Sequence, residues 1–305
     1  MSWHAAPREV GTEVFARLPD ALRRTGRASA WGEANKGGPV DCFLEGPAFD
    51  ADGTLWCTDI PWGRIIRVTP DGTFHLVAEY DGEPNGLAFS PSGVLHIADY
   101  ARGILTLDAA TGAVTPRLER RRGERFKGPN DLVFAADGTL YFTDQGQTGL
   151  QDPTGRVYRL FPDGRLEMLL GNVPSPNGIA LDEDARALFV AVTRANQVWR
   201  VPLPPEGGTA KVHAFVTLTG GTSGPDGLAL DEAGGLCVAH ASLGTVWRVS
   251  RLGEPELRIR SSVGMNATNI AYGGPDRRSL FITESESGTI LRATLDRAGR
   301  PLPWP

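Results

Sequence analysis

The sequence contains few cysteines and no long hydrophobic run. Only three cysteines occur among its 305 residues, at Cys42, Cys57 and Cys237. So small and odd a number does not fit a disulfide framework, and two of the three lie in apolar strand patterns, which predicts reduced, packed thiols. No stretch approaches about 18 apolar residues, and residues 1–12 lack the apolar core of a signal peptide. We therefore expect a cytoplasmic protein without a membrane span.

A strong excess of one charge is also absent. The formal net charge of −5 gives no reason to expect nucleic acid or an anionic membrane as a partner. Nothing in the sequence indicates an obligate protein partner. One basic cluster stands out, at 120–122 with Arg125 and Lys127, and it lies beside Glu119 and Glu124. This cluster is either a solvated loop or a gate for anionic substrates.

Several familiar catalytic motifs are missing. There is no Gly-x-Ser-x-Gly elbow, no His-Glu-x-x-His, no Cys-x-x-Cys pair and no phosphate-binding loop. These absences exclude the usual nucleophilic and zinc-protease interpretations. No window has a sustained period of about 3.6 residues, so helices are not expected to carry the fold.

What the sequence does contain is an internal repeat. A short phrase, such as Asn-Gly-Leu-Ala-Phe at 85–89 or Asp-Gly-Leu-Ala-Leu at 226–230, returns six times at spacings of 40 to 49 residues. Its opening residues, which we call the ring residues, are Glu45, Asn85, Asn130, Asn177, Asp226 and Thr268. A repeat of this length is typical of a β-propeller with one four-stranded blade per repeat. We therefore predict an all-β, six-bladed propeller.

The repeats account for nearly the whole chain, which predicts one domain over residues 1–305. The chain ends soon after the third strand of the sixth repeat, while residues 12–18 have strand character ahead of the first. We expect this N-terminal strand to complete the last blade and close the ring, since closure removes exposed sheet edges. The irregular stretch at 19–44 is either a lid over the central channel or plain surface packing.

Equivalent positions of a propeller surround one axis, so the ring residues should meet at one mouth of the channel. Blade strands are antiparallel, which brings the ends of the second strands to the same mouth. These ends are Asp59, Asp99, Asp144, Val192, His240 and Glu284. Carboxylates gathered in a funnel repel one another unless a cation compensates them, and an all-oxygen set favours a hard divalent ion such as Ca²⁺, Mg²⁺ or Mn²⁺.

Some members of the ring have a simpler interpretation. Asn-Gly and Asp-Gly are common turn dipeptides, but Glu45 is not a turn former and still occupies the same register. Asn85 and Thr268 are either ligands or strand starts. Asp131 stands where other repeats have glycine, and it is a candidate to contact substrate or to support the metal ligands.

His240 is the only histidine expected at the mouth. It is a candidate for acid–base chemistry or substrate contact, with metal ligation and a purely structural role as alternatives. At the ends of the second strands, Asp59, Asp99 and Glu284 are better explained as turn residues.

The repeated motifs resemble the SMP-30/gluconolactonase/LRE family over essentially the whole chain. The motifs are Leu-Glu-Gly-Pro at 44–47, Gly-Pro-Asn-Asp-Leu-Val-Phe at 128–134, Leu-Tyr-Phe-Thr-Asp at 140–144, Ser-Pro-Asn-Gly-Ile-Ala at 175–180, Gly-Pro-Asp-Gly at 224–227 and Thr-Asn-Ile-Ala at 268–271. The resemblance implies a six-bladed propeller with one divalent metal in its channel, and hydrolysis of sugar-acid lactones or related electrophiles.

By motif, the resemblance places the metal ligands at Glu45, Asn177 and Asp226, with Asn130 as a further ligand or substrate contact. Sugar lactonases of the family often have arginine two residues before the asparagine that matches Asn130. Here that residue is Gly128, with Lys127 beside it. The candidate substrate contacts are Asn85, Lys127, Asn130 and Asp131.

The resulting hypothesis is a metal-dependent lactonase. The ion, Ca²⁺ first and Zn²⁺, Mn²⁺, Mg²⁺ or Fe²⁺ as alternatives, would polarise the lactone carbonyl while Asp226, or second His240, takes a proton from water. The alternatives are a hydrolase of phosphotriesters or non-sugar lactones and a non-catalytic binding propeller. A condensing enzyme of the strictosidine-synthase type shares the fold class, but the metal-ligand set argues against it.

Overall fold

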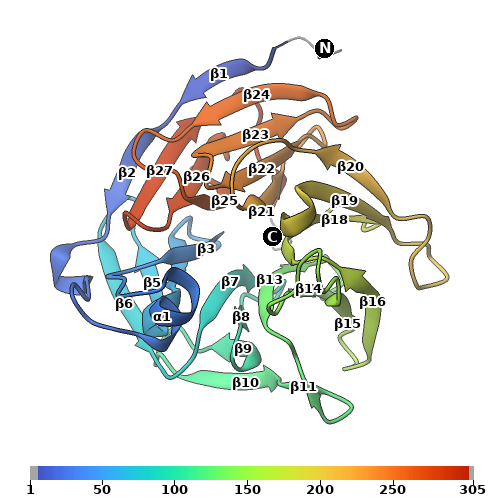
Figure 1. The fold of residues 1–305 in the computed structure, drawn as a ribbon, viewed down its shortest axis with the longest axis horizontal. Coiled ribbons are helices and arrows are strands. Elements are labelled where there is room, and N and C mark those ends of the chain that lie inside the picture. Colours follow the sequence, from blue (N-terminus) through green and yellow to red (C-terminus); the bar gives the residue numbers. More distant parts are fainter. Residues whose placement is uncertain (1–5, 302–305) are drawn as a thin grey trace.

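Six small β-sheets surround a central axis in the computed structural model, which describes residues 6–301 (Figure 1). The strands that follow one another in sequence within a blade pair antiparallel, and the first strand of each such run is innermost. The inner strands are β3 (Leu44–Phe49), β7 (Pro84–Phe89), β13 (Pro129–Phe134), β17 (Pro176–Leu181), β21 (Gly224–Leu230) and β25 (Ala267–Gly273). Neighbouring inner strands contact one another in a closed circle. The predicted six-bladed propeller is confirmed.

The other strands follow in order outward from the axis within each blade. They are β4 (Leu55–Asp59), β5 (Arg64–Val68) and β6 (Phe74–Glu79) in the first blade, β8 (Leu95–Asp99), β9 (Gly103–Leu107) and β10 (Val114–Leu118) in the second, and β14 (Leu140–Asp144), β15 (Gly155–Leu160) and β16 (Leu166–Val173) in the third. The fourth blade adds β18 (Ala187–Val192), β19 (Gln197–Pro202) and β20 (His213–Thr217), the fifth β22 (Leu236–Ala241), β23 (Thr245–Val249) and β24 (Pro255–Arg260), and the sixth β26 (Ser279–Glu284) and β27 (Thr289–Thr294).

The sixth blade obtains its outer strand from the beginning of the chain. Strand β2 (Glu13–Arg17) pairs antiparallel with β27, with Glu13 opposite Arg292, as the sequence predicted. Strand β1 (Arg8–Gly11), which was not predicted, pairs parallel with β24 of the fifth blade. The N-terminal segment therefore spans two blades and covers the outer edges of β24 and β27.

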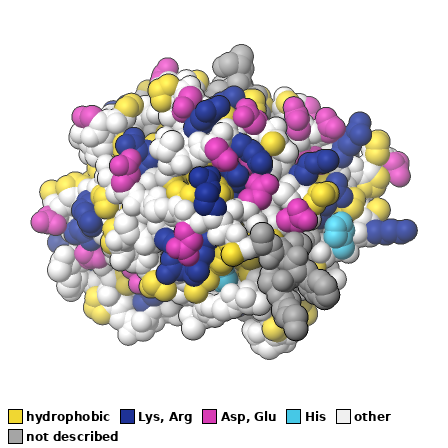
Figure 2. Space-filling model, turned by 90° about the horizontal axis from the view of Figure 1, so that it is seen from above, with side chains coloured by type: hydrophobic (Ala, Val, Ile, Leu, Met, Phe, Trp, Pro, Cys, Tyr) yellow, Lys and Arg dark blue, Asp and Glu magenta, His cyan; other side chains and the backbone are white. Residues whose placement is uncertain are grey.

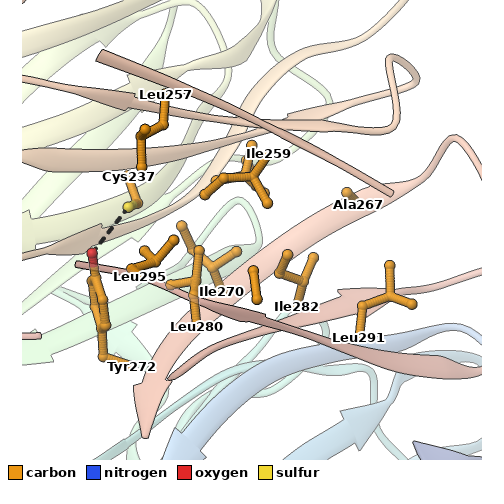
Figure 3. Packing of buried hydrophobic residues seen from close by; sticks show 13 residues of the cluster. Cys237, Leu257, Ile259, Ala267, Ile270, Tyr272, Leu280, Ile282, Leu291 and Leu295 are labelled. Atoms are coloured by element: carbon orange, nitrogen blue, oxygen red, sulfur yellow. Dashed lines mark hydrogen bonds between the residues drawn. The ribbon is translucent and has the colours of Figure 1, made fainter. Parts of the chain in front are cut away.

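The hydrophobic core lies between adjacent blades. Figure 3 shows one such layer, where side chains of the fifth and sixth blades pack together. The Sγ of Cys237 lies 3.3 Å from the hydroxyl of Tyr272 within it. All three cysteines are free and buried, which confirms the prediction of packed thiols.

Residues 19–44 contain two short helices that the sequence did not indicate. They are the 3₁₀ helix Asp20–Leu22 and α1 (Ala30–Lys36), which packs against a second 3₁₀ helix, Ile60–Trp62. The Oγ of Ser29 caps α1 by accepting the Gly32 N–H at 3.0 Å. A seven-residue helix is too short to produce a recognisable hydrophobic period, which explains why pattern reasoning missed it.

Two further elements complete the described chain. A two-stranded hairpin, β11 (Arg120–Arg121) and β12 (Glu124–Arg125), lies between the second and third blades, and a 3₁₀ turn spans Thr193–Ala195. Among residues 6–301, no helix is long and apolar enough to cross a membrane. On the side shown in Figure 2, basic and acidic side chains are interspersed with small hydrophobic patches.

Candidate metal centre at the mouth of the channel

The six ring residues lie near the beginnings of the six inner strands, at one end of the channel. Five of them are buried, with exposed fractions of 4% for Glu45 and 9% for Asp226, and Asn85 is half-buried. Each inner strand has a register shift directly after the ring position, for example between Glu45 and Ala48 and between Pro176 and Ile179. Such bulges redirect side chains, and their repetition in every blade turns the ring residues toward one centre.

Glycine after the ring residue permits the inner strands to approach closely. A Cβ at Gly46 would lie 2.1 Å from the carbonyl oxygen of Asn85, and one at Gly178 would lie 2.2 Å from that of Asp226. Neither position has room for a side chain. The repeated Asn-Gly and Asp-Gly pairs therefore serve strand packing around the axis as well as local backbone geometry.

Glu45 is held by donors from two blades. Its Oε2 accepts the Gly46 N–H at 2.9 Å, and side chains of Thr268 and Asn269 from the sixth blade also hydrogen-bond to the carboxylate. Burial nevertheless raises the pKa of Glu45 above its ordinary value, and these hydrogen bonds oppose that shift.

Asp226 and Asp131 lie close enough to Glu45 for their charges to interact. Burial raises the pKa of Asp226 well above its ordinary value, and the charges of Glu45 and Asp131 raise it further, while a hydrogen bond from the Asn177 side chain opposes them. Burial also raises the pKa of Asp131 to about 7. Three buried carboxylates around one axis are costly without a compensating cation.

Asn130 provides a buried oxygen without a protein partner. Its Nδ2 donates to Oε1 of Gln145 at 2.9 Å, and Gln145 in turn donates from Nε2 to the Oγ of Ser175 at 2.9 Å. The Oδ1 of Asn130 is buried and accepts no hydrogen bond. An unpaired buried acceptor costs free energy, so an oriented amide oxygen of this kind fits a cation-binding role.

The donor chemistry fits a hard divalent ion. Glu45 and Asp226 supply carboxylate oxygens, and Asn130 and Asn177 supply amide oxygens, which are the ligands that Ca²⁺ and Mg²⁺ prefer. Within residues 6–301, no three side chains of the His, Cys, Asp and Glu types are grouped as a metal site. The candidate set therefore depends on its two amides as well as on its carboxylates.

A layer of hydroxyl groups supports the ring, and sequence reasoning missed it. The Oγ1 of Thr143 donates to the Asn177 carbonyl at 2.7 Å, and that of Thr58 donates to the Asn85 carbonyl at 2.9 Å. Ser285 hydrogen-bonds to the Thr268 hydroxyl and donates to the Leu44 carbonyl. The repeated Thr before the acidic end of the second strand, as at 58–59 and 143–144, was the available signal.

His240 lies opposite Pro225, next to Asp226, but both of its ring nitrogens have protein partners. Nδ1 accepts the indole N–H of Trp247 at 3.2 Å, and Nε2 lies 3.2 Å from the carbonyl oxygen of Gly220. This pairing indicates the tautomer with the proton on Nε2. Burial lowers the pKa of His240, which keeps the ring neutral.

The acidic ends of the second strands bind main-chain N–H groups. Asp59 accepts from Phe43 at 2.8 Å, Asp144 from Gly128 at 2.8 Å, and Glu284 from Asn266 at 2.9 Å. Asp99 accepts from Ala101 and Arg102. These contacts support the interpretation of Asp59, Asp99 and Glu284 as turn residues rather than ligands, and Asp144 has a contact of the same kind.

Two candidate substrate contacts lie apart from the carboxylate cluster. Lys127 lies two residues before β13, and its Nζ donates to the Oγ1 of Thr154 at 2.5 Å. The half-buried Asn85 is the ring member most open to solvent. Neither has a hydrogen bond or ion pair to Glu45 or Asp226 within the described part of the chain.

A cavity lies on the other side of the ring. It has a volume of about 630 Å³, and Asp131 and Asn269 line it together with the apolar ends of the inner strands. Arg300 and Pro301 also line it, while Glu45, Asn130, Asn177 and Asp226 do not. The channel is therefore divided at the level of Asp131, with the candidate metal centre on one side and an apolar chamber on the other.

Comparison with known proteins shows the family of the chain. Residues 43–286 match the family described as the SMP-30/gluconolactonase/LRE-like region. A gluconolactonase from Zymomonas mobilis is 29% identical over 281 residues, covering 82% of this chain and 78% of the relative. The lactonase drp35 of Staphylococcus aureus is 29% identical over 259 residues, covering 78% and 75% of the two chains.

A solved structure shows the same fold. The calcium-binding protein regucalcin from Agrobacterium tumefaciens superimposes with a TM-score of 0.77 at 24% identity, covering 98% of this chain and 99% of that one.

Proposed function

Because the chain belongs to the SMP-30/gluconolactonase/LRE-like family, we propose that it is a divalent-metal-dependent lactonase. In this role it hydrolyses a sugar-acid lactone or a related small lactone. Relatives named gluconolactonase and lactonase support the reaction class. The observation that carries the proposal is the unpartnered, buried Oδ1 of Asn130 in the same ring as the buried carboxylates of Glu45 and Asp226.

Glu45, Asn130, Asn177 and Asp226 would hold one divalent ion. Ca²⁺ is the first candidate because all four donors are hard oxygens, and Mg²⁺, Mn²⁺, Zn²⁺ or Fe²⁺ are alternatives. When bound, the ion supplies positive charge that compensates the two carboxylates and stabilises negative charge developing on the lactone carbonyl oxygen.

The side chains around this centre have separate tasks. Asp226 accepts the proton of the attacking water, since it is the ring carboxylate with the fewest main-chain donors. The carboxylate of Asp131 accepts the Leu132 N–H at 2.8 Å, and this bond helps to fix the backbone next to Asn130. His240 fixes the 220–225 loop ahead of Asp226 through its contact with Gly220.

Substrate binding falls to residues at the mouth. Asn85 is the ring member with open access, and Asn130 and Asp131 are the further candidates to orient lactone oxygens. We propose that residues 19–44 act as a lid. The Nζ of Lys36 in α1 binds Glu286 at 2.8 Å, an ion pair that holds this segment against the sixth blade.

The test is proton release on a panel of aldono-1,4- and 1,5-lactones and simple aliphatic lactones, with spontaneous hydrolysis subtracted. We expect a rate above background for at least one lactone class and its loss in Asp226→Asn. Asp163→Asn, which removes the same charge from an exposed turn, is the matched control and should retain the rate. Hydrolysis of phosphotriesters but not lactones, or no turnover of either, would overturn the lactonase proposal.

A further inference from the structure

A basic hairpin stands beside the third blade. Strands β11 and β12 form it, and its two turn residues have positive φ values, 51° at Arg122 and 85° at Gly123. Two such residues in succession are typical of the tight turn that suits a twisted hairpin. Figure 1 shows β11 projecting beyond the outer end of β10. The hairpin is therefore an ordered addition to the propeller.

Beneath the hairpin lies a cleft of about 360 Å³. We call it the basic cleft, and it is lined by Arg121, Lys127, Thr154, Arg156, Met168 and Gly171. Three of these six residues carry a positive charge, and none carries a negative charge. They come from the hairpin, from the segment before β13, and from the start of β15, so the fold gathers cations that are distant in the sequence.

Local carboxylates compensate only one of the three cations fully. Arg156 binds Glu124 at 2.9 Å and lies 4.0 Å from Asp144. Lys127 donates instead to the hydroxyl of Thr154, and the guanidinium of Arg121 lies 5.9 Å from the ring centre of Tyr158. Within residues 6–301, neither Arg121 nor Lys127 has a carboxylate at ion-pair distance. Arg121 and Lys127 therefore line the cleft without an ion pair, although the charge of Glu124 acts on both and that of Asp144 acts on Lys127.

The cleft opens on the same side of the propeller as the candidate metal centre. Lys127 precedes Asn130 by three residues, which limits the distance between their Cα atoms to roughly 10 Å. Thr154 precedes Gly155, which packs so tightly that a Cβ there would lie 2.3 Å from Cδ of Pro176. Pro176 is the residue before Asn177. The cleft is thus connected to both amide ligands by short stretches of packed backbone.

We propose that the basic cleft binds a small oxyanion, namely a phosphate or carboxylate group. The guanidinium fork of Arg121 can donate to two oxygens of such a group, and the ammonium of Lys127 can supply a third contact. The Thr154 hydroxyl donates to Oδ1 of Asp152 at 2.6 Å and accepts from Lys127, so it positions the ammonium. The proposal does not depend on the proposed lactonase activity, since it concerns a binding equilibrium that is measured without turnover.

The first test is calorimetric titration of the full-length protein with inorganic phosphate at low ionic strength. The wild type should bind one phosphate, and Arg121→Gln and Lys127→Gln should each weaken binding about tenfold, since a hydrogen bond to a charged group is lost. Arg125→Gln is the matched control, because it removes one exposed charge from the same hairpin without lining the cleft. Absence of saturable binding, or equal weakening by Arg125→Gln, would overturn the proposal.

A second measurement identifies the source of the oxyanion. If phosphate competes with hydrolysis of a neutral lactone in the wild type but not in Lys127→Gln, the group belongs to the substrate. If phosphate binds without affecting hydrolysis, the ligand is a separate anion. Either result supports the cleft as a binding site, while unaltered phosphate binding in Arg121→Gln and Lys127→Gln contradicts it.

Discussion

Asn130 donates through Nδ2 to Oε1 of Gln145 at 2.9 Å, and the same side chain presents a buried Oδ1 without a partner. The two facts are connected, because the bond to Gln145 fixes which end of the amide faces the channel. Gln145 is itself held by the Oγ of Ser175. The orientation of one candidate ligand therefore depends on a residue outside the ring.

Gln145→Ala should weaken metal binding. Without the acceptor at Gln145, the Asn130 amide can rotate, and loss of such an orienting partner typically costs about 10- to 100-fold in metal affinity. Calorimetric titration of chelator-stripped protein with Ca²⁺ measures this. Gln151→Ala, at an exposed position, is the control. Equal Ca²⁺ affinity in Gln145→Ala and wild type would show that the bond does not orient a ligand.

Asp226→Asn should stabilise the metal-free protein while removing its response to metal. The substitution relieves the repulsion of Asp226 by Glu45 and Asp131 in a buried site, worth about 1–3 kcal/mol of unfolding free energy. Thermal unfolding of both proteins, once with chelator and once with Ca²⁺, gives the stability of the metal-free state and the stabilisation by the ion. If metal-free Asp226→Asn is no more stable than the metal-free wild type, or if Ca²⁺ still stabilises the variant, then repulsion between the buried carboxylates does not destabilise the metal-free protein in the way proposed.

His96 should make the protein sensitive to acid. Burial lowers the pKa of His96 to about 4, and the ring packs against Phe134. The unfolded chain, with its pKa near 6.5, therefore takes up a proton before the folded state does. The contribution of His96 to the free energy of unfolding is fully present above about pH 6.5 and is lost as the pH falls toward 4. The loss is about 2 kcal/mol between roughly pH 7 and pH 4.5.

Urea unfolding of wild type and His96→Gln at these two pH values checks this prediction. The variant should lose less stability on acidification than the wild type, whatever its stability at neutral pH. His213→Gln, on the exposed strand β20, controls for removal of one imidazole. The same loss on acidification in wild type and His96→Gln would rule out His96 as the acid-sensitive group.

His240→Ala should lower turnover without removing the metal. The ring bridges Trp247 and Gly220, so its loss loosens the loop ahead of Asp226, and such misplacement can cost about tenfold or more in rate. The pH dependence of turnover should keep its shape, because neither ring nitrogen is free to exchange protons with substrate. Loss of one limb of the pH profile in His240→Ala would instead identify His240 as the general base.

The sequence predicted the repeated framework well. Spacing and turn dipeptides indicated six blades, and the strand character of residues 12–18 indicated the closing strand, because periodic features of this kind are local and repeated. Strand β1 was missed because a four-residue parallel pairing with β24 depends on tertiary placement alone. The helix α1 was missed because seven residues do not establish a period.

The ring residues could be predicted because symmetry converts one sequence register into one place in space. Their supporting contacts could not. Gln145 directly follows β14 and Ser175 directly precedes β17, so the two residues come from different blades and from outside the strands. His240 has the right register, but the placement of Trp247 in the neighbouring strand determines what its ring contacts.

The most direct test of the account compares hydrolysis and metal binding in one titration. Chelator-stripped protein should show no lactone hydrolysis above background, and the rate should return with added Ca²⁺ along the same curve as calorimetric binding of one ion. Asp226→Asn should show neither the binding nor the rate. Full activity in stripped protein, or a rate that does not follow occupancy by any of the candidate divalent ions, would contradict a metal-dependent lactonase.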